Sequence, residues 1–426
     1  MLPQKFSSCF AAFKISRRFY KVLAIESSCD DSCVALLEKT RHNRFPVALD
    51  EAKSTLNSAK TGGIIPTAAH EFHQQSMAAL VATFCTKHNL SAANPPDLIC
   101  VTRGPGMVGS LSAGLQLAKG LAVAWNKPLI GVHHMLGHLL VAKLPRNCSQ
   151  SQNELKYPFL SLLCSGGHTM LVLSTSLTEH EIIINTSDIA AGDSLDKCAR
   201  ELGFSGNMLG PELERYVSNI SDAQKERFSQ IRTFDSDNEF GFRLKMPMRN
   251  PKRGKIPEKL EFAFASFLST ITAYKKDRPF TEDSRQFVAY KLQEVIFDHI
   301  VNRIQVAFLK YTPSDENGLQ KGKFDDVKDF VCSGGVAANK VLRHKLFNDL
   351  NTSNALNFHF PDLSLCTDNA TMIGNAGIEI FENLRKKSSL SILPIRKWPM
   401  NELLDVDGWS DMTYEEYHSI IGSKDQ

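Results

Sequence analysis

Long hydrophobic runs are absent from this sequence of 426 residues. A membrane-spanning helix needs about 18 to 20 consecutive apolar residues, whereas the longest apolar stretches here, such as residues 159–164, have the length of a strand. We therefore expect no membrane partner. The net charge of +3 is mildly basic, so it allows a nucleic-acid partner without requiring one. A chain of this length favours two lobes over one small core.

Paired cysteine motifs are also absent. The ten cysteines include no CxxC pair and are scattered along the chain without a regular spacing, which argues against a disulfide scaffold. Cys100, Cys164 and Cys332 stand in apolar strand contexts, as small buried hydrophobic residues do in a reducing compartment. Cys29 and Cys33 are four apart, but their stretch is typical of a strand, a turn and a second strand, so we expect no zinc site there.

Acidic residues are missing from residues 98–153. This gap excludes a dinucleotide site at residues 104–109 (GPGMVG), because the GxGxxG pattern needs an acidic residue about 20 positions later to bind the ribose. The cations left without nearby acids are Arg103, Lys119, Lys127, Lys143 and Arg146. These cations form either a basic surface next to a functional site or an ordinary solvated face, and both interpretations stay open.

The first 21 residues differ in composition from the rest and contain no acid. Their cations are Lys5, Lys14, Arg17, Arg18 and Lys21, and their apolar face consists of Phe6, Phe10, Phe13 and Phe19. This composition predicts a mitochondrial presequence and a matrix location, while the lack of a continuous apolar core argues against secretion. A disordered basic tail is the alternative.

Two strand-turn-strand units open the two halves of the remaining chain. Residues 22–26 and 33–37 are apolar runs around a polar turn, and residues 157–164 and 170–173 repeat this plan. A third strand, residues 330–336, leads into a helix. Helices are also expected at 110–125, 284–309 and 370–384. Strands mixed with helices predict an α/β class, and the repeated unit indicates a duplicated core.

We expect four regions along the chain. They are a presequence over 1–21, an N-terminal lobe over 22–156, a C-terminal lobe over 157–400 with an irregular insertion at about 219–259, and a tail over 401–426.

His134 and His138 form the most informative pair in the sequence. The apolar residues 129–132 predict the end of a buried strand, and a helix is expected from there to residue 144. Two histidines four apart lie on one face of a helix, close enough for both imidazoles to bind one metal ion. His133 lies off that face, so it is the weaker partner. The alternative is a pair of structural histidines, because HxxxH alone is a loose pattern.

Asp368 stands immediately before the helix expected at 370–384. It is either the N-cap of that helix or the carboxylate that completes a site of two histidines and one acid, with open positions for substrate. His70 and His73 are three apart and do not form HExxH, so we interpret them as structural or as supports of the site.

Glycine-rich turns follow two of the expected strands. The first consists of Ser165, Gly166, Gly167, His168 and Thr169, and the second is residues 333–335 (SGG). Backbone N–H groups in such turns approach phosphate oxygens closely, so the pair suits the phosphate and adenosine ends of one nucleotide. Tight hairpin turns are the alternative.

Seven short motifs stand out along the chain. They are residues 26–31 (ESSCDD), 62–66 (GGIIP), 102–110 (TRGPGMVGS), 132–138 (VHHMLGH), 165–169 (SGGHT), 333–339 (SGGVAAN) and 366–369 (CTDN). Together they resemble the tRNA N6-adenosine threonylcarbamoyltransferase family, and with the presequence the chain resembles its mitochondrial branch. The motifs appear in family order, cover most of residues 22–400 and are collectively highly specific.

The resemblance implies a duplicated actin/Hsp70-like ATPase fold of two lobes, with the site in the cleft between them. It implies one divalent metal cation per subunit on His134, His138 and Asp368, without distinguishing iron, zinc and magnesium. Glu26 and Asp30 fall on the family's acidic first turn, where they would orient or deprotonate an attacking amine. The implied contacts to an adenylate substrate are Ser165, Gly166, Gly167, His168, Thr169, Asp196, Gly210 and Asn339.

The activity implied by the resemblance is acyl transfer to tRNA. A threonylcarbamoyl group passes from L-threonylcarbamoyl adenylate, supplied by a separate synthase, to N6 of the adenosine just 3′ of the anticodon (position 37). The acceptors are mitochondrial tRNAs that read ANN codons, and AMP is released. The resemblance also implies a homodimer.

Two stretches depart from the family pattern. Residues 203–211 (GFSGNMLGP) replace a stretch like Tyr-Pro-Gly-Gly-Pro and are one residue longer, which makes the assignment of Gly210 less secure. Residues 262–268 (FAFASFL) replace Phe-Ser-Phe-Ser-Gly-Leu-Lys and lack its glycine and lysine, so no role of that lysine carries over.

Two functions of other classes compete with acyl transfer. A metalloprotease is suggested by HxxxH, but without HExxH no general-base glutamate sits between the metal ligands. A non-enzymatic ATP-binding chaperone or scaffold on the same fold would leave the two histidines and Asp368 unexplained.

Overall fold

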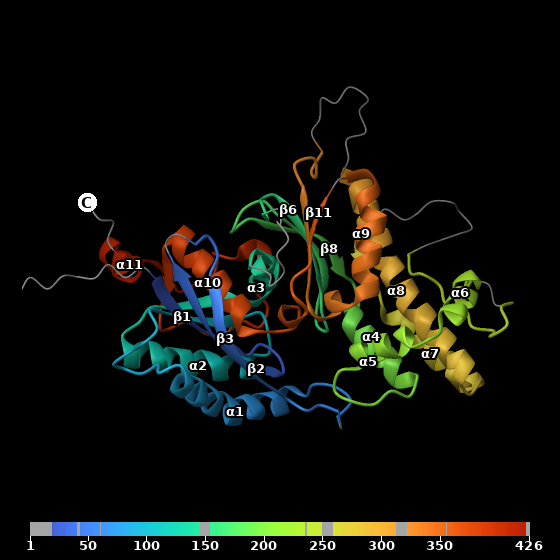
Figure 1. Ribbon diagram of the computed structural model, residues 1–426, viewed down its shortest axis with the longest axis horizontal. Coiled ribbons are helices and arrows are strands. Elements are labelled where there is room, and N and C mark those ends of the chain that lie inside the picture. Colours follow the sequence, from blue (N-terminus) through green and yellow to red (C-terminus); the bar gives the residue numbers. More distant parts are fainter. Residues whose placement is uncertain are drawn as a thin grey trace, which may run out of the picture.

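The computed structural model describes residues 19–40, 43–59, 61–144, 154–234, 237–248, 259–311, 322–354 and 356–422. Most of the expected presequence therefore lies outside the described residues, as does Arg146. Two β-sheets, each covered by helices, form two lobes, with a short helix between them (Figure 1). Among the described helices, none combines the length and the hydropathy needed to cross a membrane.

The first sheet has the strand order β3-β2-β1-β4-β5. Strands β1 (Phe19–Glu26), β2 (Asp31–Thr40) and β3 (Val47–Thr55) form an antiparallel meander. Strands β4 (Leu98–Gly104) and β5 (Leu129–His133) continue the sheet in parallel with β1. The apolar runs at residues 22–26 and 33–37 are thus paired strands, as expected from the sequence.

Both faces of the first sheet are covered, because the side chains of β1 alternate. Leu23 and Ile25 pack with helices α1 (Pro66–Lys87) and α2 (Val108–Trp125). Val22 and Ala24 face the other way, toward helix α10 (Ala370–Leu384). Burial on both faces explains why β1 is an almost continuous apolar run.

The second sheet repeats the plan of the first. Its order is β11-β10-β6-β7-β8-β9, and β6 (Phe159–Cys164), β7 (Thr169–Ser174) and β8 (His180–Thr186) form an antiparallel meander. Strands β10 (Asp329–Ser333) and β11 (Asn357–His359) follow in parallel with β6, and β9 (Glu261–Phe262) adds a short edge. The duplicated core predicted from the two strand-turn-strand units is confirmed.

Helices of the second lobe pack around an extensive apolar core. They are α4 (Ala191–Glu201), α5 (Leu209–Ser218), α6 (Asp222–Gln230), α7 (Ala265–Asp277), α8 (Glu282–Tyr311) and α9 (Lys340–Asn354). Helix α6 lies within residues 219–259, which we expected to be irregular; Ser221 caps it and Phe228 anchors it in the core. Phe262 and Phe264 of the altered motif are also buried there.

The chain returns to the first lobe near its end. Helix α10 lies within residues 157–400, yet it packs against β1, β2, β4 and β5 of the first sheet. The hairpin β12 (Lys386–Ser388) and β13 (Trp409–Asp411) and helix α11 (Tyr414–Ile421) follow it. Short 3₁₀ helices are η1 (Val141–Lys143), η2 (Gly335–Ala338), η3 (Leu363–Leu365) and η4 (Met400–Glu402). Helix α10 therefore belongs to the first lobe, although we expected residues 157–400 to form the second lobe.

Candidate functional site

Helix α3 (His134–Leu140) follows β5 directly and contacts both sheets. Its four-residue spacing places the rings of His134 and His138 with their centroids 4.9 Å apart. Asp368 Oδ1 lies 3.6 Å from His134 Nε2 and 3.2 Å from His138 Nε2. One nitrogen or oxygen atom from each of the three residues lies within 4.8 Å of the others. The structure therefore brings the three predicted metal ligands together.

Asp368 is not the N-cap of the following helix. That position belongs to Asn369, whose side chain accepts a hydrogen bond from Met372 N. The Asp368 carboxylate instead faces the two histidines. Its main-chain carbonyl accepts a hydrogen bond from Lys53 Nζ at 3.1 Å, which ties this turn to strand β3.

Glu26 lies behind His134 and is completely buried. Its carboxylate contacts His134 Nδ1 at 3.1 Å, and it accepts hydrogen bonds from Ser28 N at 2.5 Å and from the Thr102 hydroxyl. A carboxylate at Nδ1 holds a proton on that nitrogen, so loss of the second proton from the His134 ring would free Nε2, which faces Asp368.

Electrostatics make this cluster attractive to a cation. Burial alone would lower the pKa of His134, but the nearby charges of Glu26 and Asp368 outweigh it and raise the pKa to about 9. Burial alone would raise the pKa of Asp368, but His134 and His138 hold it below its usual range. Positive charge is thus stabilised here, and a bound metal cation would take the place of the proton.

The donor set fits a divalent metal ion. Two imidazole nitrogens and one carboxylate oxygen make a three-ligand set that leaves coordination positions open for substrate. Glu26 orients His134 in the way that an outer carboxylate orients a metal-binding histidine. His138 Nδ1 is buried and has no hydrogen-bond partner among the described residues, so only Nε2 is engaged, with Asp368.

Three other histidines near this centre, His133, His73 and His70, make structural contacts. His133 caps α3 by accepting from Met135 N, and its Nε2 contacts Trp398 O at 2.9 Å. Burial lowers the pKa of His133 to about 3, so it stays neutral. His73 bridges Ser32 Oγ and Cys29 O, and His70 Nδ1 contacts Gly109 O. The weaker role expected for His133 agrees with its direction away from Asp368.

The turn between β6 and β7 lies beside the metal ligands. Burial, together with the charges of His134 and His138, lowers the pKa of His168 to about 4. Ser165 N donates to His168 O at 2.7 Å, which closes the turn. A Cβ added to Gly166 or Gly167 would meet no heavy atom within 4 Å, so this backbone faces open space. Thr169 Oγ1 accepts from Ala191 N and so fixes the start of α4.

A second turn packs against the first. Gly334 has a φ of +101°, and a Cβ there would lie 2.5 Å from Cys164 O, so a side chain is excluded. Ser333 Oγ donates to His138 O at 2.7 Å and connects β10 to helix α3. Asn339 uses its Oδ1 to cap α9, and its Nδ2 donates to Gln293 at 3.1 Å.

Asp196 and Gly210 meet at the start of α5. Gly210 N donates to Asp196 Oδ1 at 2.8 Å, and burial raises the pKa of Asp196. Asp30 is half-buried on the first turn, where burial and the charges of Asp31 and Asp368 raise its pKa to about 6.

The glycine-rich stretch 104–109 serves close packing. A Cβ on Gly106 would lie 2.7 Å from Ser28 O, next to the turn that holds Glu26. This contact explains the glycine without a dinucleotide, in agreement with the sequence argument.

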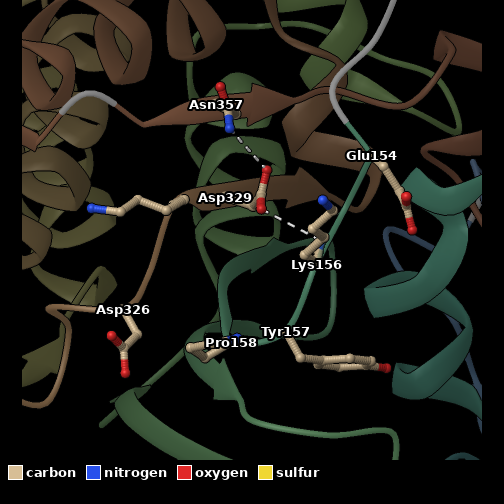
Figure 2. Close-up of a pocket in the computed structure, with 8 residues that line it drawn as sticks. Glu154, Lys156, Tyr157, Pro158, Asp326, Asp329 and Asn357 are labelled. Carbon is tan, nitrogen blue, oxygen red and sulfur yellow. Dashed lines mark hydrogen bonds between the residues drawn. The ribbon is translucent and has the colours of Figure 1, made fainter.

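One cavity lies away from this centre. It has a volume of about 450 Å³ and is found at the amino ends of β6 and β10, whereas the two glycine-rich turns follow their carboxyl ends. In Figure 2 the buried carboxylate of Asp329 receives hydrogen bonds from Asn357 and from the backbone of Lys156. His359 also contacts Asp329, at 2.7 Å, so this acid supports the sheet edge.

The contacts of several residues around the site were not predicted from the sequence, although Ser28 and Thr102 lie in two of the seven motifs. Thr102 and Ser28 donate hydrogen bonds to Glu26, and Lys53 donates one to the main-chain carbonyl of Asp368. The contacts of Thr102 with Glu26 and of Lys53 with Asp368 join residues 76 and 315 positions apart, so they depend on the folded arrangement of strands, which local patterns do not encode.

Comparisons with known proteins agree with this geometry. The TsaD family model, described as tRNA N6-adenosine threonylcarbamoyltransferase, matches residues 49–375. The mitochondrial tRNA N6-adenosine threonylcarbamoyltransferase of Schizosaccharomyces pombe is 36% identical over 410 residues, which cover 93% of this chain and 90% of that protein. The tRNA N6-adenosine threonylcarbamoyltransferase of Wolbachia sp. subsp. Brugia malayi is 31% identical and covers 89% of this chain and 98% of its own. That of Kosmotoga olearia is 32% identical over 84% of this chain and 93% of its own. With its duplicated actin/Hsp70-like fold, this chain belongs to the tRNA N6-adenosine threonylcarbamoyltransferase family.

Proposed function

We propose that this protein transfers the threonylcarbamoyl group of L-threonylcarbamoyl adenylate to N6 of the adenosine just 3′ of the anticodon. The acceptors are mitochondrial tRNAs that read ANN codons. The adenosine amine forms a bond to the carbamoyl carbon, the bond from that carbon to the phosphate oxygen breaks, and AMP and a proton leave. Family membership supports the reaction, and the meeting of His134, His138 and Asp368 beside two glycine-rich turns carries the proposal.

His134 Nε2, His138 Nε2 and Asp368 Oδ1 are the atoms that would hold one divalent cation. Such a cation would act as a Lewis acid on the carbamoyl and phosphate oxygens of the donor.

The turns would position the adenylate. Gly166 and Gly167 are exposed and carry no side chain, so phosphate oxygens can approach the backbone of this turn closely. Asp196 of α4, Gly210 in the first turn of α5 and Asn339 before α9 belong to the same lobe, and these three residues are proposed to contact the nucleoside. Fixing the reacting carbon against the incoming amine supplies a large part of the acceleration in transfers of this kind.

The two acids of the first turn are proposed to have different roles. Asp30 is half-buried and able to orient the incoming amine or receive its proton. Glu26 is enclosed by Ser28, Thr102 and His134, so its contacts favour a positioning role through His134 over direct contact with the amine.

The competing functions lack support from this geometry. A metalloprotease of the HExxH type carries its general-base glutamate between the two histidine ligands, and no glutamate lies between His134 and His138. A binding scaffold would need neither the converging ligands nor their outer carboxylate. Incubating the purified protein with threonylcarbamoyl adenylate and unmodified tRNA, then measuring threonylcarbamoyladenosine, tests the proposal; absence of product would contradict it.

Mitochondrial import is proposed to depend on the first residues. Deleting residues 1–18 should abolish import while activity in vitro is retained, because this basic, acid-free stretch ends before β1, which begins at Phe19 rather than at residue 22 as expected from the sequence. Imaging a tagged, truncated protein measures the location, and an assay of the purified protein is the control. Continued mitochondrial location of the truncated protein would refute the targeting role.

Residues 245–255 (KMPMRNPKRGK) are proposed to contact tRNA phosphates, because they carry five cations and no acid. Most of this segment lies outside the described residues. Replacing Lys252, Arg253 and Lys255 by serine should weaken tRNA binding more at low salt than at high salt. Binding is measured at two salt concentrations, and an unchanged affinity with an unchanged salt slope would exclude the contact.

The proposed partners are tRNA, a separate synthase that supplies the adenylate, and a second copy of the chain in a homodimer. Family membership supports tRNA as the acceptor.

A further inference from the structure

The loop between α4 and α5 contains the stretch in which this chain departs from the family pattern. Asn207 of this loop makes three hydrogen bonds to the segment that follows β3. Its Oδ1 accepts from Ser58 N and from Ser58 Oγ, both at 2.7 Å, and its Nδ2 donates to Leu56 O at 3.1 Å. Only this orientation of the amide satisfies all three partners.

These hydrogen bonds connect the two lobes. Leu56 and Ser58 continue the last strand of the first meander, whereas α4 and α5 pack into the core of the second lobe. Ser58 is only 6% exposed, so its contacts with Asn207 are shielded from water. In Figure 1 the segment between β3 and α1 extends under α4 and α5, far from its own sheet.

Both ends of the link lead to residues of the site. Leu56 N donates to Asp30 O at 2.9 Å, which joins the first-lobe end to the acidic turn. Three residues beyond Asn207, Gly210 N donates to Asp196 Oδ1. A change in the distance between Leu56 and Asn207 would therefore change the distance between Asp30 and the α4–α5 connection.

We propose that Asn207 is a positioning residue that ties the two lobes together at one end of the cleft and sets the spacing needed by the adenylate donor. This role rests on the proposed transferase function. Asn207→Ala removes all three hydrogen bonds. Asn207→Asp keeps an acceptor for Ser58 but loses the donor to Leu56 O and places a carboxylate against that carbonyl. Ser58→Ala removes one hydroxyl and leaves the backbone donor in place.

The kinetic test is a comparison of KM and kcat for threonylcarbamoyl adenylate. Asn207→Ala should raise the KM by about 10-fold and change kcat by less than about threefold, because neutral hydrogen bonds of ordinary strength are lost away from the reacting atoms. Asn207→Asp should resemble it, and Ser58→Ala should have a smaller effect. Asn219→Ala, at the exposed end of α5, is the matched control and should leave both constants unchanged.

Hydrogen exchange tests the link itself without relying on activity. The amide of Ser58 should exchange faster in Asn207→Ala than in the wild type or in Asn219→Ala, because its acceptor is lost. A wild-type protein without transferase activity would refute the proposed function but would leave this result interpretable. Unchanged exchange at Ser58, or a KM for Asn207→Ala equal to that of the control, would overturn the proposal.

Discussion

His134→Ala, His138→Ala and Asp368→Ala should each remove most of the bound divalent metal and lower threonylcarbamoyl transfer by more than about 100-fold. This loss exceeds the 10- to 100-fold effect typical of residues that only support a metal ligand. Each substitution removes one of three converging atoms, and two remaining ligands hold a cation weakly. Metal content by elemental analysis and a tRNA modification assay measure the two losses together.

His133→Ala is the matched control for these variants. It removes a buried histidine from the same stretch, but its partners are Met135 N and Trp398 O, not Asp368. We expect a loss of about 2 to 4 kcal/mol in the free energy of unfolding from the missing helix cap, the lost hydrogen bond to Trp398 O and the cavity, with metal content retained. Circular dichroism monitors folding of all four variants. Full metal and activity in the three ligand variants, or greater damage from His133→Ala, would show that the site is assigned wrongly.

Glu26→Gln should weaken metal binding by about 10- to 100-fold while the fold survives, because the amide keeps the size of the side chain but loses its negative charge. The His134 ring would then lack the carboxylate that fixes its Nδ1 proton and directs Nε2 toward Asp368. Activity should fall at low metal concentration and recover as metal is added, which separates positioning from direct proton transfer.

Glu38→Gln serves as the comparison for Glu26→Gln, because Glu38 is on the neighbouring strand β2 and away from the ligands. It should bind metal like the wild type. If Glu26→Gln retains wild-type metal affinity, or if saturating metal leaves its activity low, the proposed role of Glu26 through His134 is incorrect.

Local sequence patterns predicted which residues meet at the candidate metal site. The spacing of His134 and His138 specifies one helical face, and Asp368 was expected at the start of α10, where the structure places it. The choice between ligand and N-cap for Asp368 could not be made from the sequence, because Asp368 and Asn369 are both good caps. The fold resolved it by giving the cap to Asn369.

Features that depend on distant contacts were not predicted. The apolar face of α10 does not reveal which sheet it covers, so its return to the first lobe emerged only from its packing on β1 and β2. In the same way, residues 203–211 showed an unusual length, but nothing in them indicated that Asn207 would meet Ser58 across 149 positions. Sequence periodicity identifies elements and their buried faces, whereas partners between lobes are set by tertiary geometry.

The most direct test of the central claim is metal reconstitution of the transfer reaction. Purified protein is stripped of metal and incubated with threonylcarbamoyl adenylate and unmodified mitochondrial tRNA, with and without one equivalent of a divalent cation. We predict that threonylcarbamoyladenosine and AMP form in equal amounts only after the cation is added, and that Asp368→Ala forms neither. Equal product formation by stripped and reconstituted protein, or by wild type and Asp368→Ala, would contradict a transferase centred on His134, His138 and Asp368.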